Sequence, residues 1–163
     1  MRPKKHLPSE FSCSQTMRAI LCLLTLTLAF PSVLPAQDIT FPRTKQVYRE
    51  GDKSKQRDVA LEFLDKELLV KHRKDDRVYA TIPYDSVTEI TYEMSKNARI
   101  AEAILLSPLF LLSSSKKHWL TVKYQTGGES DFVLLQLDKK EYQQAIATSE
   151  VRTGKKVTRV LEN

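Results

Sequence analysis

The residues that could perform nucleophilic chemistry in this 163-residue chain are three consecutive serines, Ser113 to Ser115, followed by His118 and Asp131. A serine, a histidine and an aspartate form the triad of many hydrolases, in which the histidine takes the serine proton. Here the serines stand in no Gly-x-Ser-x-Gly turn, and a serine run between an apolar segment and a strand is explained as a linker. A serine hydrolase is therefore the remote alternative, and we predict that the protein is not an enzyme.

The chain lacks the residue patterns that cofactor and metal sites need. The chain has four glycines, two of which are adjacent at Gly127 and Gly128, so none is left for a phosphate-binding loop. Beyond the first 36 residues the histidines are His72 and His118, which makes a histidine-rich metal site unexpected. We predict no cofactor and no metal.

Lys116 and Lys117 precede His118 and Trp119, and this combination admits two interpretations. An aromatic side chain can stack on a ligand while a neighbouring cation pairs with its negative charge. In the alternative interpretation, which we favour, Trp119 packs beside a strand and His118 is exposed.

The most unusual segment is an apolar insert at residues 98–112, which contains few polar residues and Pro108. Fifteen residues are too few for a membrane span, which needs about 20. We favour a segment packed on the sheet, and keep as the alternative a partial insertion into a membrane surface with lysines at the headgroups. The candidate contacts for a membrane or a partner are Ile104, Leu105, Leu106, Leu109, Phe110, Lys116, Lys117 and Trp119.

The first 36 residues predict a leader with a signal peptide. Arg18 precedes a 12-residue apolar run at 19–30, and the small residue Ala36 before Gln37 offers a cleavage point. Met17 is a better start than Met1, because Met17 and Arg18 followed by the apolar run make a compact signal peptide. We expect an exported protein, located in the periplasm or associated with the cell envelope.

Cleavage of this leader changes the charge and the cysteine count. It removes Cys13 and Cys22, and leaves 22 basic against 19 acidic residues, so the net charge falls from +6 to +3. A spread excess of +3 argues against a nucleic-acid partner. Without cysteine, the mature chain has no disulfide and no thiolate site.

The remaining elements form a β-rich pattern. Residues 37–57 are polar and predict a linker. Apolar and polar residues then alternate, which predicts strands; these lie at 58–64, 67–72, 78–82, 86–94, 119–124 and 131–137. Asp138 and Glu141 have the spacing of a helix capping box, Gly154 ends the predicted helix, and residues 157–161 add a short strand.

Such a meander followed by one helix predicts a mainly β fold, a bent antiparallel sheet or open barrel capped by a C-terminal helix. The pattern resembles the pleckstrin-homology-like (GRAM/PH-like) superfold, especially its bacterial members, across residues 58–162. Three stretches carry the resemblance, around Leu61 to Val70, at Ile82 to Ile90, and from Phe132 to Val157. The chain is also similar to small exported proteins with an apolar segment before a Lys-Lys-His-Trp-Leu-Thr stretch, here Lys116 to Thr121.

The resemblance implies a non-enzymatic binding or interaction module. Phosphoinositide-binding members carry several basic residues at their first hairpin, whereas Asp65, Lys66 and Glu67 here place one lysine between two acids. We therefore do not transfer inositol-phosphate binding. The prediction is an exported interaction module of the cell envelope with a protein or membrane-surface partner; the alternative is a peripheral membrane protein that uses residues 98–112.

Overall fold

The computed structural model describes residues 37–160, apart from residues 52, 76 and 97–114. The predicted leader and the apolar insert, with Ile104, Leu105, Leu106, Leu109 and Phe110, lie outside the described residues. The described chain is mainly β. Its elements are β1 (Ile39–Glu50), β2 (Lys53–Phe63), β3 (Glu67–His72), β4 (Val78–Pro83), the 3-10 turn η1 (Tyr84–Ser86), β5 (Val87–Ser95), β6 (Lys117–Thr126), β7 (Glu129–Leu137), α3 (Tyr142–Thr153) and β8 (Val157–Val160).

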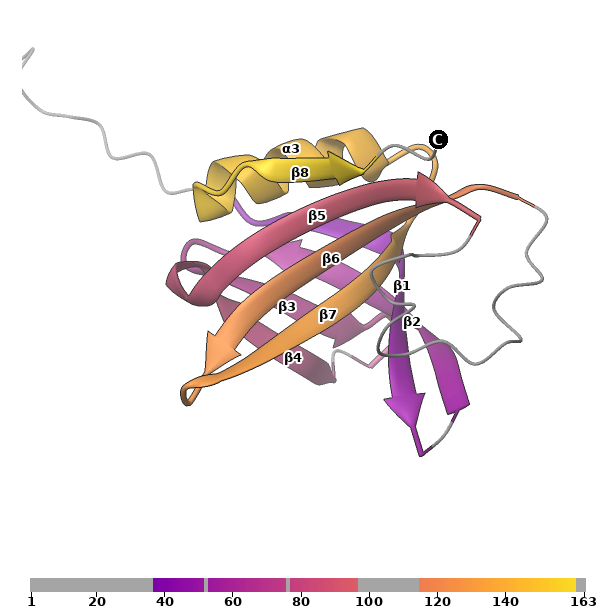
Figure 1. The fold of residues 1–163 in the computed structure, drawn as a ribbon, viewed down its shortest axis with the longest axis horizontal. Helices are drawn as coiled ribbons and strands as arrows, with labels where there is room; N and C mark the ends of the chain where they lie inside the picture. The colour runs from indigo at the N-terminus through magenta and orange to yellow at the C-terminus, as the bar shows by residue number, and fades with distance from the viewer. Residues whose placement is uncertain (1–36, 52, 76, 97–114, 161–163) are drawn as a thin grey trace, which may run out of the picture. The chain divides into compact units, whose positions relative to one another are not determined.

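The eight strands form one sheet in the order β4-β3-β2-β1-β7-β6-β5-β8. The neighbours pair antiparallel, except that β8 joins β5 in parallel. Because β4 and β8 lie at opposite ends of this order, the sheet is bent but not closed. Figure 1 shows β5, β6 and β7 curving across β3 and β4, with α3 and β8 along one side. The predicted mainly β architecture with one C-terminal helix is confirmed.

The core lies on the inner face of the bend. Every second residue of β2, from Val59 through Leu61 to Phe63, is fully buried there, as the alternating pattern predicts. Leu120 and Leu135 come from the second half of the sheet and belong to the same cluster. The alternation thus buries one face of each strand around a common interior.

The predicted linker at residues 37–57 is wrong. This segment forms β1 and the first part of β2, which pair with each other from Ile39 to Glu50. The pairing shifts register between Phe41 and Thr44, where Pro42 stands in the strand. A bulge is one of the few places where a strand accepts proline, so the residue that suggested a linker marks an irregularity in a strand.

The helix α3 begins four residues later than the predicted cap. Asp138 accepts a hydrogen bond from the Lys140 backbone N–H at 2.9 Å, which makes a turn before the helix. Glu141 is the N-cap residue and makes no side-chain capping bond. The reciprocal capping box is therefore wrong, because the Glu141 carboxylate instead approaches Arg43, with 3.8 Å between Oε1 and Nε.

The end of α3 follows the prediction. Gly154 adopts a left-handed conformation with φ 65°, and its N–H donates to the Glu150 carbonyl at 3.0 Å. Glycine adopts this conformation without steric cost. The chain then turns into β8, and Val157 reaches the core.

Candidate functional site

A basic pocket of about 290 Å³ opens beside the middle of β1, the start of β6 and the end of β7. Its described lining residues are Arg43, Lys45, Ser115, Lys116, Lys117, His118, Gln136, Leu137, Asp138 and Lys139. Pairing of Lys45 and of Trp119 with Gln136 brings β1 and β6 to either side of β7. The pocket therefore exists only because the sheet order places β7 between two strands that are distant in sequence.

Positive charge predominates in the basic pocket. Five of the ten lining residues named above are lysine or arginine. The Arg43 guanidinium is near Glu141, and the Lys117 ammonium lies 5.8 Å from the centre of the Trp119 ring. The Asp138 carboxylate accepts a hydrogen bond from the Lys140 backbone N–H. Such a concentration of cations creates a positive potential that attracts anions.

An aromatic stack of Tyr92, His118 and Tyr142 adjoins the basic pocket. The His118 and Tyr142 ring centres are 3.8 Å apart at an interplanar angle of 13°. The Tyr92 hydroxyl forms a hydrogen bond of 2.8 Å with His118 Nδ1. Three elements thus fix the imidazole, because Tyr92 lies on β5, His118 on β6 and Tyr142 on α3.

His118 is 8% exposed, so the prediction of an exposed histidine is wrong. Its backbone pairs with Leu137, and the ring lies on the inner side of the sheet below the first turn of α3. Burial lowers the pKa of His118 below 6.5; the charge of Lys139 acts in the same direction, while Asp138 opposes it. The ring is accordingly neutral near pH 7.

A second cleft of about 360 Å³ adjoins the aromatic stack. Tyr92 and Tyr142 line it, together with the apolar Ile146 of α3 and the basic Arg159 of β8. Lys116 lines both this cleft and the basic pocket. The two cavities therefore share one described cationic residue.

Comparison with known proteins rests on architecture alone. No family model matches the sequence, and no curated protein matches it. The bent, unclosed sheet with a helix following its last antiparallel strand has the topology that the sequence predicted. The described fold is mainly β, a bent and unclosed sheet with one helix, which is consistent with a pleckstrin-homology-like fold.

Two solved structures are similar to this chain at low sequence identity. One is the Spt16D Pob3N heterodimer, with a TM-score of 0.49, 10% identity, and coverage of 78% of this chain and 56% of that chain. The chain thus spans little more than half of that protein. The other is the hSac2 domain from the human phosphoinositide phosphatase Sac2, with a TM-score of 0.43, 12% identity, and coverage of 96% and 92%. Similarity at this level carries no argument about function.

The structure places the described candidate contact residues in two different environments. Lys116 and Lys117 line the basic pocket. Trp119 is 4% exposed and packs with Val47 and Leu134 on the face of the sheet opposite the main core. Its indole N–H donates to the Ser95 carbonyl at 3.2 Å. Trp119 is therefore a packing residue, as the favoured interpretation predicted, and is not placed for surface contact.

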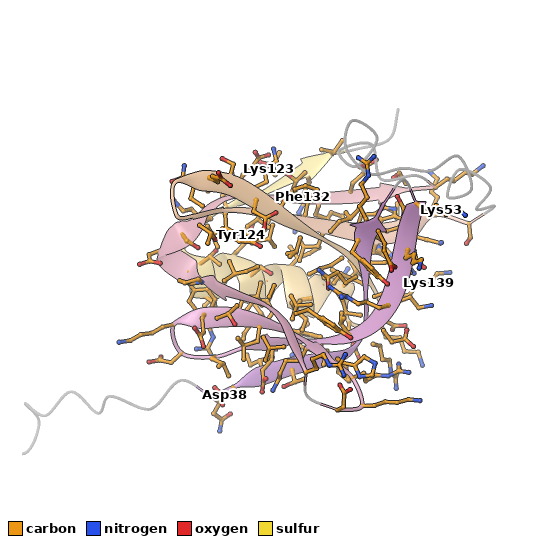
Figure 2. All side chains as sticks on the ribbon, turned by 90° about the horizontal axis from the view of Figure 1, so that it is seen from below. Asp38, Lys53, Lys123, Tyr124, Phe132 and Lys139 are labelled. Atoms are coloured by element: carbon orange, nitrogen blue, oxygen red, sulfur yellow. The ribbon has the colours of Figure 1, made fainter. Side chains whose placement is uncertain are left out.

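The serine triad is not assembled by the described residues. His118 pairs with Leu137 and Asp131 pairs with Tyr124, so six residues of strand separate the two positions. At about 3.4 Å per residue this is roughly 20 Å, far beyond hydrogen-bond reach. Asp131 instead accepts a hydrogen bond of 2.9 Å from the Tyr124 hydroxyl. Figure 2 shows Tyr124 and Lys139 at opposite ends of this hairpin.

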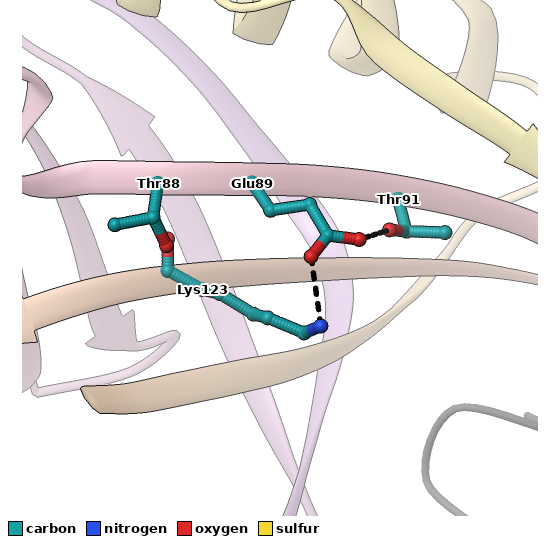
Figure 3. Close-up of polar contacts among 4 residues, drawn as sticks. All are labelled: Thr88, Glu89, Thr91 and Lys123. Carbon is teal, nitrogen blue, oxygen red and sulfur yellow. Dashed lines mark hydrogen bonds and ion pairs between the residues drawn. The ribbon is translucent and has the colours of Figure 1, made fainter.

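A polar cluster on β5 and β6 also lacks the features of a catalytic centre. The Lys123 ammonium donates to the Glu89 carboxylate at 2.8 Å, and the Thr91 hydroxyl donates to the same carboxylate at 2.9 Å (Figure 3). The Lys123 bond, followed by that from Thr91, lowers the pKa of Glu89. This carboxylate is ionised and paired, which suits a stabilising contact between strands rather than proton transfer.

The described residues show neither a metal-binding cluster nor a membrane-spanning helix. They contain no cluster of three or more His, Cys, Asp or Glu side chains placed to hold a metal ion. Within the same residues, no helix has the length and apolarity that a membrane span requires.

Most residues of the basic pocket have no local signal in the sequence. Arg43 and Lys45 fall in the segment expected to be a linker, and Lys139 follows a predicted strand as one of many charged turn residues. Only the adjacent Lys116 and Lys117 beside an aromatic pair suggested anion binding. The signal that could have connected them is the strand order, which local patterns do not contain.

Proposed function

We propose that this protein is an exported, non-enzymatic binding module of the cell envelope, of the bacterial GRAM/PH-like kind, which holds an anionic group of its ligand in the basic pocket. The observation that carries the proposal is the convergence of Arg43, Lys45, Lys117 and Lys139 from separate elements on one pocket. Lysine and arginine side chains gathered in a concave site strengthen one another's attraction for an anion.

The cationic side chains have few competing partners within the described chain. The Arg43–Glu141 separation of 3.8 Å is long for an ion pair, and the Asp138 carboxylate is held by a backbone N–H. Lys45 and Lys139 form no ion pair with any described residue. An anion entering the pocket would therefore not have to displace protein carboxylates from these two lysines.

Anion binding is tested by titrating the full chain with sodium sulfate at constant ionic strength, with sodium chloride as the balancing salt. We expect saturable shifts of the backbone amide resonances at His118 and Lys139. The double variant Lys45→Gln/Lys139→Gln should weaken sulfate binding by about tenfold, which corresponds to about 1.4 kcal/mol. Lys53→Gln/Lys155→Gln removes the same charge outside the pocket and is the matched control.

Two results would contradict this assignment. Equal weakening by the pocket variant and the control variant would show a general charge effect rather than a site. Uniform small shifts of the amide resonances without saturation would show that the described cations attract sulfate non-specifically and hold it at no defined site. In either case the basic pocket is not the binding site.

Export is tested separately. The full chain with a C-terminal tag is expressed in a bacterial host, and the N-terminal residue of the protein in the periplasmic fraction is determined. We expect Gln37, since cleavage after Ala36 fits the predicted leader. Retention of the leader, with the protein in the cytoplasmic fraction, would overturn the localisation.

Peripheral membrane binding is the second proposed function, because Lys116 and Lys117 follow the apolar insert after three serines and line a basic pocket. Flotation of the full chain with phosphatidylcholine vesicles containing phosphatidylglycerol would recover the protein with the lipid. The Leu105→Glu/Phe110→Glu variant should remain at the bottom of the gradient. Flotation unaffected by this variant would exclude insertion of residues 98–112.

The absence of enzymatic activity is tested by a fluorophosphonate probe that labels activated serines. We expect no labelling of the full chain, since His118 and Asp131 are about six residues of strand apart. Labelling that is lost in the Ser115→Ala variant would restore the hydrolase alternative.

A further inference from the structure

The second cleft, of about 360 Å³, is lined mainly by apolar and aromatic side chains, unlike the basic pocket. Five of its eight described lining residues are of this kind: Tyr92, Met94, Tyr142, Ile146 and Val160. Pockets that bind small molecules measure about 300–1,000 Å³ and are mostly apolar, with a few polar groups that orient the ligand. The second cleft has the size and the composition of such a pocket.

Its apolar walls come from the sheet and from α3, which lies beside β8 and β5 in Figure 1. Tyr92 and Met94 are two residues apart on β5, so their side chains leave the sheet on the same face. Tyr142 and Ile146 are four residues apart on α3 and therefore lie on one side of the helix. The rings of Tyr92 and Tyr142 stack with 5.8 Å between their centres, which holds the two walls together.

Part of the apolar surface in the second cleft is open to water. Met94 is 43% exposed, although it lies in a concave site that Val160 and two tyrosines also line. A single exposed apolar side chain on a flat surface needs no explanation, but one inside a largely apolar cleft marks a place for an apolar group. Covering Met94 with the aliphatic part of a ligand is favourable, because apolar area is removed from water.

The charged residues that line the second cleft, Lys116 and Arg159, are both cations. Arg159 pairs in register with Tyr92, so its side chain leaves β8 on the face of the sheet that carries the aromatic stack. Within the described ranges, the Arg159 guanidinium forms no ion pair. Glu150 lines a neighbouring pocket with Arg159, but its carboxylate accepts a hydrogen bond of 2.9 Å from the Val157 backbone N–H. The guanidinium is therefore open to an anionic ligand.

These walls and charges match a ligand that is apolar along its length and anionic at one end. A guanidinium presents a planar fork of N–H donors, which fits the two oxygens of a carboxylate. A cavity of about 360 Å³ has the volume of about a dozen waters at about 30 Å³ each, and so admits about a dozen non-hydrogen atoms. A straight-chain carboxylate of about eight to ten carbons has this size.

We propose that the second cleft binds an aliphatic carboxylate of medium chain length, with its carboxylate at Arg159 and its chain between Met94 and Ile146. The occupant is a single free acid rather than a bilayer, because the cleft has room for about one chain and its lining includes Ile146, which is only 2% exposed. This site goes beyond the proposed function and does not depend on anion binding in the basic pocket. Lys116 lines both cavities and adds positive charge to each.

The ligand class is tested with octanoate, kept at concentrations at which it is monomeric, and its binding to the full chain is measured by calorimetry. Shorter acids should bind more weakly than octanoate, by about fourfold for each methylene that is lost. Octanol and octylammonium carry the same chain without the negative charge, and each should bind at least about tenfold more weakly. Octanol binding as tight as that of octanoate would overturn the role of Arg159, and an affinity independent of chain length would overturn the role of the apolar walls.

The location of the ligand is tested on the wild-type chain by NMR. The side-chain methyl resonances of Met94 and Ile146 should shift as octanoate is added, and the shifts should saturate together. Val78 is an exposed apolar residue on β4, outside the second cleft, and its methyl resonances are the internal control. Saturable shifts at Lys45 and Lys139 without shifts at Met94 would place octanoate in the basic pocket and overturn the inference.

Two variants at exposed positions separate the charge from the apolar surface. Arg159→Gln should weaken octanoate binding by about tenfold and leave octanol binding unchanged, because only the carboxylate loses its partner. Lys155→Gln removes one positive charge before β8, outside the second cleft, and is its matched control. Met94→Ser should weaken octanoate and octanol alike, with Val78→Ser as its control. Losses in either control that equal those in its partner variant would overturn the site. If Arg159→Gln does not fold, the comparison of octanol with octanoate on the wild type decides the same point.

The second cleft and the basic pocket can fail independently of each other. Lys45→Gln/Lys139→Gln should leave octanoate binding unchanged, and saturating sulfate should not displace octanoate at constant ionic strength. Sulfate binding without octanoate binding would overturn this inference alone, whereas octanoate binding without sulfate binding would overturn the proposed function alone. Full displacement of octanoate by sulfate would show one shared site and overturn a separate site for the carboxylate.

Discussion

The imidazole of His118 lies 3.8 Å from the ring of Tyr142 and nearly parallel to it, which joins the first turn of α3 to the strand that lines the basic pocket. Replacing Tyr142 with Ala should lower the free energy of unfolding by about 1–3 kcal/mol, because packing and stacking are both lost. Tyr142→Phe keeps the ring and should stay within about 0.5 kcal/mol. Urea unfolding measures both variants, and equal losses would show that the hydroxyl rather than the ring matters.

Acid should destabilise the protein through His118. Because its pKa is lowered in the folded state, the unfolded chain binds a proton at a higher pH than the folded chain does. The stability that this neutral ring provides is complete above the ordinary value of 6.5 and is lost as the pH falls through it toward the folded value. Urea unfolding at several pH values should show a smaller acid loss for His118→Gln than for the wild type; equal losses would contradict the buried neutral ring.

Alkali should destabilise the protein through Tyr84 and Tyr124. Burial raises the pKa of each to about 12, and for Tyr124 the bond to Asp131 adds to the effect. Because an unfolded tyrosine titrates near 10, their contribution to stability is complete below that pH and is lost between about 10 and about 12. Absorbance of the phenolate form should report a late titration that disappears in Tyr84→Phe/Tyr124→Phe. A late phase of unchanged size would show that other tyrosines account for it.

The ion pair of Glu89 and Lys123 should contribute little. Their side chains are 46% and 43% exposed, and exposed pairs are worth about 0.2–1 kcal/mol. A double-mutant cycle with Glu89→Gln and Lys123→Met measures this coupling from unfolding free energies. The coupling should shrink in high salt. A value that salt does not change would mean that hydrogen bonding, including that from Thr91, dominates the contact.

Gly154, the left-handed residue at the end of α3, should be sensitive to substitution because of its backbone conformation. Gly154→Ala should cost about 1 kcal/mol, because a β-carbon disfavours the φ of 65° even though no atom lies within 4 Å of its place. Gly154→Asn should cost less, since asparagine tolerates this conformation. Equal costs, measured by thermal unfolding, would point to a lost packing contact instead of backbone strain.

The sequence predicted the elements whose signals are local. The alternation from Val59 to Phe63 and the glycine after α3 each obey a rule that involves only near neighbours. The sequence did not predict strand β1, because its buried positions include Thr44 and Gln46 and because Pro42 interrupts it at a bulge. Polar residues on the inner face remove the alternation on which strand prediction depends.

The site was less predictable than the fold. Lys45, His118 and Lys139 come to line one pocket through the pairing of β7 with both β1 and β6. Residue pattern identifies a strand but does not name its partner, so no window of sequence contains this pocket. Burial of His118 likewise depends on where α3 docks, which the sequence around Lys116 does not encode.

Pairing of β1 with β7 also joins two segments that are distant in the sequence. Lys45 to Val47 pair with Leu134 to Gln136, so this edge of β1 gains its neighbour only when β7 is available. Contacts between such distant segments make folding slow and leave strand edges exposed in the meantime. Until β7 pairs with it, this edge of β1 is open to pairing with the strand of another chain.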